Sequence, residues 1–142
     1  MSKNILISMR NTQIIDDEPQ LIEVTARGQY FVKENKEYIL FEERVEELGD
    51  VVLNRITIDE KNNTVKVKKE GSIAFELEFK NSLRHSSIYK TVLGELAIDI
   101  TTKKLNVTRD SLKILIIVEY SLAMNFDEVA VCTMEIECSH LE

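Results

Sequence analysis

Glu43 has a carboxylate that could orient a small ligand, and its neighbours in the alternating pattern are apolar. Glu43 is two residues from Phe41 and two from Val45, so in an extended strand all three side chains point to the same face. A carboxylate on a buried face is costly unless a base pairs with it, and we consider Arg109 and Arg55 as its counter-charge. Either Glu43 lies at the mouth or floor of a ligand-binding interior, or a bulge turns it to solvent.

Four further polar residues share the parity of apolar neighbours: Tyr30, Thr102, Arg109 and Tyr120. Arg109 follows Leu105 and Val107 at intervals of two, and Tyr30 lies on the apolar face of its own segment. At a barrel mouth they could bind the polar part of a ligand. The simpler alternative is that Arg109 ends a strand and reaches water.

The sequence argues against nucleophilic and metal chemistry. His85 and His140 are the only histidines. His140 is close to the end of the sequence, and His85, although several serines are near it, is expected to be a solvated loop histidine before a strand. Neither has the spacing of a metal ligand or an acid that would orient it as a base. No dinucleotide fingerprint, P-loop or HExxH motif occurs, and four glycines are too few for a phosphate cradle. We therefore expect no catalytic residues, no metal and no cofactor.

Two cysteines, Cys132 and Cys138, lie six residues apart in one extended segment. At about 3.3 Å per residue their Cα atoms are about 20 Å apart, too far for a disulfide. We expect both to be free, buried thiols in a reducing compartment.

The composition is that of one ordinary globular domain, expected over residues 1–140, with 141–142 as a cloning remnant. The net charge of −7 (18 basic and 25 acidic residues) argues against nucleic-acid binding. The sequence has no apolar run near the roughly 18 residues of a membrane span, and its first residues lack the apolar core of a signal peptide. The expected location is the cytoplasm, with no membrane partner.

The dominant pattern is an alternation of apolar and polar residues that repeats almost from end to end. It is clearest in 73–79, where Ile73, Phe75, Leu77 and Phe79 alternate with an alanine and two glutamates, and longest in 112–124 and 130–138. Residues 11–19 contain the only proline and are predicted to be a loop. The remaining segments predict about ten strands with connections too short for parallel crossovers.

These strands predict an all-β fold. Each has one apolar face, and a single up-and-down antiparallel β-barrel of about 8–10 strands buries all of them and removes the sheet edges.

Several segments together resemble the YwiB-like proteins, a bacterial family of uncharacterised function with a calycin- or lipocalin-like barrel. They are Tyr30–Glu43, with its paired glutamates at the end, Phe75–Phe79, the Tyr-Lys-Thr-Val-Leu-Gly element of 89–94, and Thr101-Thr102. The similarity runs through about residues 2–138 in the same order. It implies a barrel fold and no known activity, and it is the only reason to add Tyr89 and Thr91 to the candidate ligand-binding residues.

Three function classes are compatible with these observations. The first is a barrel that binds a small apolar or amphipathic ligand. The second is a protein-interaction or structural module with a packed core, such as a homodimer formed through exposed apolar residues (Leu21, Phe31, Tyr38 and Leu40). The third is an enzyme that uses Glu43 as a general acid or base. An internal cavity of about 300 Å³ or more favours the first class over the second.

Overall fold

The computed structural model describes residues 3–45 and 50–141, and every regular element in these ranges is a β-strand. The ten strands are β1 (Lys3–Ile15), β2 (Glu18–Lys33), β3 (Lys36–Val45), β4 (Asp50–Asp59), β5 (Thr64–Glu70), β6 (Phe75–Phe79), β7 (Arg84–Thr91), β8 (Gly94–Arg109), β9 (Lys113–Met124) and β10 (Asp127–His140). These ranges contain no helix long and apolar enough to cross a membrane.

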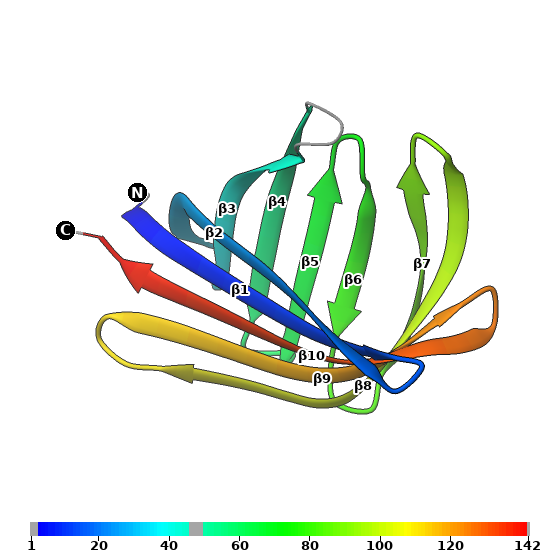
Figure 1. Cartoon of the computed structure of the whole chain (residues 1–142). Helices are drawn as coiled ribbons and strands as arrows, with labels where there is room; N and C mark the ends of the chain where they lie inside the picture. Colours follow the sequence, from blue (N-terminus) through cyan, green and yellow to red (C-terminus); the bar gives the residue numbers. More distant parts are fainter. Residues whose placement is uncertain (1–2, 46–49, 142) are drawn as a thin grey trace.

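The strands form one antiparallel sheet in the order β6-β5-β4-β3-β2-β1-β10-β9-β8-β7. Strands that follow one another in sequence pair, except β6 and β7, and β1 pairs with β10. The sheet therefore curls into a barrel with its two edges, β6 and β7, facing each other (Figure 1). One bridge joins these edges: Ala74 and Lys90 exchange backbone hydrogen bonds of 2.9 and 2.8 Å. The predicted all-β, up-and-down antiparallel barrel is confirmed, in a nearly closed form.

The predicted loop at 11–19 is wrong. Strand β1 continues to Ile15, and the chain reverses in a two-residue turn at Asp16 and Asp17, whose φ angles are 51° and 62°. Aspartate tolerates this left-handed conformation, which matches the twist of a hairpin. Pro19 follows directly within β2, opposite Ile14.

A β-bulge changes the alternation along β8. The apolar alternation of 96–100 and that of 105–107 have opposite parity, yet β8 runs unbroken from Gly94 to Arg109 with a register shift between Thr102 and Lys104. The extra residue inverts the alternation, so Ile98, Ile100 and Thr102 are buried before the bulge and Leu105 after it.

The apolar faces meet inside the barrel. The most buried side chains are mainly isoleucine and valine from all around the sheet, including Ile7, Ile39, Ile56, Ile116 and Ile136, each with no exposed surface. Burying one such side chain contributes about 1.5–3 kcal/mol. Cys132 and Cys138 point inward among them and are free, as predicted.

Strands β2 and β3 approach each other closely at Gly28, and the part of β2 before Gly28 is separated from β3. A methyl group at Gly28 would collide with the carbonyl oxygen of Leu40 and the Cδ1 atom of Ile7, so only glycine fits there. The β2–β3 ladder covers Gly28–Lys33 alone, while β3 continues along β4 as far as Val45. Among the described residues, the first ten residues of β2 pair only with β1.

Candidate functional site

A pocket of about 530 Å³ occupies one end of the barrel interior, which we call the pocket end. The β1–β2, β5–β6, β7–β8 and β9–β10 turns lie at this end, because β1, β5, β7 and β9 run toward it. The pocket wall is largely apolar and includes Met9, Ile98, Ile100, Leu122, Met124 and Met134. Its polar lining comes from a few side chains, described below, that approach from opposite sides.

Glu43 lines this pocket and is paired with a lysine. Its Oε1 atom accepts a 2.9 Å hydrogen bond from Lys69 Nζ on β5 and a 3.3 Å bond from Asn54 Nδ2 on β4. The two charged side chains expose 22% and 21% of their surface. Glu43 thus faces the interior side of its strand, and its counter-charge is Lys69.

The two arginines considered as counter-charges lie elsewhere. Arg55 is on the outer face of β4, and Arg109 is at the opposite end of the barrel. Lys69 was missed although it continues the inward alternation of Val65 and Val67, because a lysine at a strand end normally reaches water.

An aromatic pair extends the rim of the pocket from Lys69 across the β6–β7 junction. Lys69 Nζ lies 5.8 Å from the centroid of the Phe75 ring, and this ring stacks on Tyr89 with a centroid distance of 5.4 Å. Both rings line the pocket. Thr91 does not line it: its hydroxyl accepts a hydrogen bond from Leu93 N–H and contacts the Gly94 carbonyl within the β7–β8 turn.

Asn11 and Tyr120 place polar atoms deeper in the pocket. Asn11 Nδ2 donates a 3.1 Å hydrogen bond to the Tyr120 hydroxyl, and burial raises the pKa of Tyr120 above its usual value. Both side chains line the pocket, as does Gln13. Asn11 and Gln13 were missed because their segment was predicted to be a loop. The alternation of Ile5, Ile7 and Met9 continues through them to Ile15, and following it would have found them.

The remaining predicted residues, Tyr30 and Arg109, meet at the opposite end of the barrel. The Tyr30 hydroxyl donates a 2.7 Å hydrogen bond to Glu37 Oε2, and the Arg109 guanidinium pairs with Glu37 Oε1. Partial burial and the Glu37 carboxylate raise the pKa of Tyr30 to about 12. The same carboxylate raises the pKa of Arg109. Glu37 and Glu43 are both on β3, six residues or about 20 Å apart, so the predicted set forms two separate clusters.

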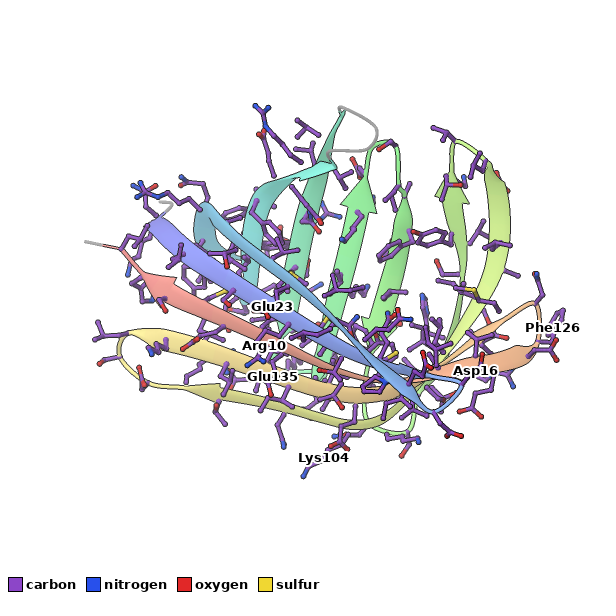
Figure 2. The ribbon with its side chains drawn as sticks, viewed as in Figure 1. Arg10, Asp16, Glu23, Lys104, Phe126 and Glu135 are labelled. Atoms are coloured by element: carbon purple, nitrogen blue, oxygen red, sulfur yellow. The ribbon has the colours of Figure 1, made fainter. Side chains whose placement is uncertain are left out.

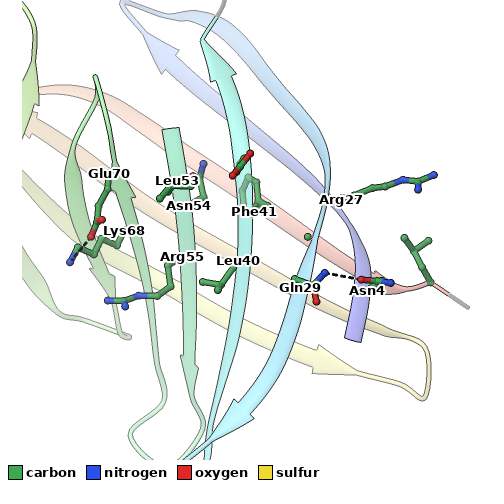
Figure 3. A pocket seen from close by; sticks show the side chains of 13 residues that line it. Asn4, Arg27, Gln29, Leu40, Phe41, Leu53, Asn54, Arg55, Lys68 and Glu70 are labelled. Atoms are coloured by element: carbon green, nitrogen blue, oxygen red, sulfur yellow. Dashed lines mark hydrogen bonds and ion pairs between the residues drawn. The ribbon is translucent and has the colours of Figure 1, made fainter. Parts of the chain in front are cut away.

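A second hollow, of about 870 Å³, lies on the outer face of the sheet where β2 and β3 bend at Gly28. Its charged side chains, including Arg27, Arg55 and the ion-paired Lys68 and Glu70, extend outward from the strands (Figure 3). Both signs of charge are present and exposed, so this groove has the chemistry of an ordinary solvated surface. In residues 3–45 and 50–141, no three histidine, cysteine or acidic side chains are grouped to hold a metal ion.

Comparisons with known proteins agree with this fold. The model of a family described as a domain of unknown function (DUF1934) matches residues 7–136. The crystal structure of the ywiB protein from Bacillus subtilis superposes with a TM-score of 0.86 and 23% sequence identity, over 99% of this chain and 94% of that one. No curated protein matches the sequence. At this identity the structural likeness shows the fold, and neither comparison supplies an activity.

Proposed function

This chain belongs to the DUF1934 family, a domain of unknown function, and we propose that it binds a small apolar or amphipathic molecule in the barrel pocket. The observation that carries the proposal is a pocket of about 530 Å³ among the buried side chains of the barrel interior. Ligand sites usually have about 300–1,000 Å³, an apolar wall and a few convergent polar groups. The barrel pocket has all three properties.

The distribution of polar groups indicates how such a ligand would lie. The apolar wall formed by β8, β9 and β10 would contact its hydrocarbon or aromatic part. Glu43 and Lys69 at the rim would bind a polar head that both donates and accepts hydrogen bonds. Phe75 and Tyr89 offer flat ring faces beside that head. An amphipathic molecule fits this arrangement better than a fully charged one, because the ion pair already balances its own charge.

Native mass spectrometry of protein purified without denaturation tests for a retained ligand, and 1-anilinonaphthalene-8-sulfonate is a suitable fluorescent probe for the pocket. Ala130→Phe adds a ring to a buried position in the pocket wall and should abolish binding of the retained ligand and of the fluorescent probe. Val131→Phe, the matched control, places the same ring on the exposed outer face of β10 and should leave binding unchanged. Equal binding by both variants would show that the probe binds elsewhere.

Glu43→Gln tests the rim. The amide preserves much of the packing, so we expect stability within about 1–2 kcal/mol of the wild type, together with loss of a retained amphipathic ligand. A purely structural Glu43 predicts unchanged ligand binding. Arg109→Met at the opposite end is the control, because it should not alter the occupancy of the barrel pocket.

The alternative functions predict other outcomes. A structural or interaction module would retain no ligand and would bind the probe no better in the wild type than in Ala130→Phe. An enzyme that used Glu43 as an acid or base would convert a ligand, and Glu43→Gln would trap it unconverted. We also propose a cytoplasmic location, supported by two thiols that stay free inside the barrel.

A further inference from the structure

We propose that the free edge of β2 is a docking site for an extended, basic segment of another protein, which adds to the barrel as a further strand. The free edge is the part of β2 before Gly28, where β2 has separated from β3. Leu21, Glu23 and Thr25 form its centre.

The register shows which backbone groups are free. The two-residue turn closes on the Ile15–Glu18 pair, which is hydrogen-bonded, so the even-numbered residues of β2 bond to β1. The odd-numbered residues direct their N–H and C=O groups to the other side. Farther along β2 these groups meet β3, but at Leu21, Glu23 and Thr25 no described strand pairs with them.

The position of Pro19 agrees with this assignment. Proline lacks an N–H group and is found in sheets at edge strands, where the missing donor would face away from the ladder. Pro19 is odd-numbered, so its place in β2 costs no hydrogen bond to β1. Pro19 is therefore where a proline is expected on the free side of an edge strand.

Exposed apolar side chains lie beside the edge on both faces of β2. Leu21 and Ile22 are 49% and 50% exposed, although Ile22 has the inward parity and lines the barrel pocket. Sheet edges in soluble proteins are normally protected by prolines, charged side chains (lysine above all), short length or a covering element, because exposed N–H and C=O groups recruit other strands. Pro19 and Glu23 give this edge part of that protection. It has no lysine, however, its Leu21 and Ile22 side chains are exposed, and no described strand pairs with its backbone, so strand addition is open to it.

The acidic residues near the edge favour a basic partner. Asp16 and Asp17 form the turn of the hairpin and Glu18 follows them. Glu23 has the outward parity at the centre of the edge, and Figure 2 shows it and Asp16 along the same hairpin. Arg10 lies 4.0 Å from Glu23 on the neighbouring strand, and Arg27 stands at the far end of the edge. Together they balance only part of this charge.

A second copy of the chain would pair Leu21 with Thr25 and place Glu23 against Glu23, the register that uses all three free residues of each edge. Like charges directly opposite are destabilising. A strand with lysine or arginine opposite Glu23, and apolar residues opposite Ile22 and Val24, is complementary instead.

The probe is a labelled peptide with alternating residues, acetyl-Lys-Val-Lys-Val-Lys-Val-Lys-amide, measured by fluorescence anisotropy with the full chain. Its controls have glutamate in place of lysine, or the same composition in the order Lys₄Val₃. We expect the alternating basic peptide alone to bind, and to slow hydrogen exchange at the amides of Leu21, Glu23 and Thr25. Equal binding of the scrambled peptide, or no binding of any peptide, overturns the proposal.

Thr25→Pro removes one edge donor without touching the β1 ladder and should weaken peptide binding about tenfold or more, the effect of about 1.4 kcal/mol. Thr25→Val keeps the N–H group and should bind within about twofold of the wild type. Should Thr25→Pro fail to fold, Glu23→Lys serves instead and should reverse the preference toward the acidic peptide. Sedimentation velocity completes the test: a wild-type dimer that Thr25→Pro or Glu23→Lys dissociates would show that a second copy occupies the edge, and would overturn the proposal.

Discussion

The ion pair at the rim of the pocket should stabilise the fold by a measurable coupling energy. Lys69 Nζ and Glu43 Oε1 are 2.9 Å apart, with 21% and 22% of the two side chains exposed. An exposed pair contributes about 0.2–1 kcal/mol, whereas removing one partner of a fully buried pair costs about 3–5 kcal/mol. The rim lies between these limits, so we expect Lys69→Met to lower the free energy of unfolding by about 2 kcal/mol.

A double-mutant cycle isolates the pair from other effects of the substitutions. Glu43→Gln keeps an acceptor for Asn54 and Lys69 and should cost about 1 kcal/mol. The double variant leaves neither charge stranded and should also cost about 1 kcal/mol, which gives a coupling energy of about 2 kcal/mol. Urea unfolding at pH 7, followed by circular dichroism, provides the four free energies.

A matched pair on the outer face of β5 is the control. Lys66 Nζ and Glu78 Oε1 are 3.8 Å apart on neighbouring strands, and their side chains are 46% and 28% exposed. The corresponding cycle, Lys66→Met with Glu78→Gln, should give less than about 0.5 kcal/mol. If the rim pair couples no more strongly than this control, water screens it, and our reasoning that the rim is partly shielded is refuted.

Three further predictions concern the core, the opposite end and the β2–β3 crossing. Burial raises the pKa of Cys138 to about 12 and also raises that of Cys132, so at pH 8 a thiol reagent should label native Cys138 about a thousandfold more slowly than an exposed thiol. Rapid labelling of both cysteines without unfolding would show that β10 faces the other way. The folded-state pKa of Tyr30, about 12, lies above the unfolded value near 10, so its stabilising effect is complete below pH 10 and is lost as the pH rises toward 12. Tyr30→Phe should flatten this alkaline loss in urea melts, and a loss equally steep in the variant would assign it to another group. Gly28→Ala should lower the free energy of unfolding by about 1–3 kcal/mol, since the added methyl group collides with a backbone carbonyl that cannot move alone, and a neutral result in the same melts would contradict the close crossing of β2 and β3.

The sequence by itself determined the fold class and the orientation of most side chains. Alternation is a local property with a period of two, so it reveals which residues share a face before any strand partner is known. It placed both cysteines on inward faces and gave Glu43 the parity of its apolar neighbours, and short polar turns required antiparallel neighbours. Local turn chemistry was harder to predict: the Asp16–Asp17 turn needs only two residues, and treating its surroundings as a loop hid Asn11 and Gln13.

Only the tertiary structure decided which inward residues meet. Glu43 and Lys69 are 26 residues apart in sequence, and they become partners because β3 and β5 both flank β4 and end near the same rim. Tyr30 and Arg109 have the same inward parity but lie at the other end, since parity fixes the face of a strand and says nothing about position along the barrel axis. The bulge in β8 and the separation of β2 from β3 at Gly28 likewise depend on how strands twist and coil against distant neighbours. The pocket and the free edge are consequences of that three-dimensional curvature, which the alternation of residues along one strand does not encode.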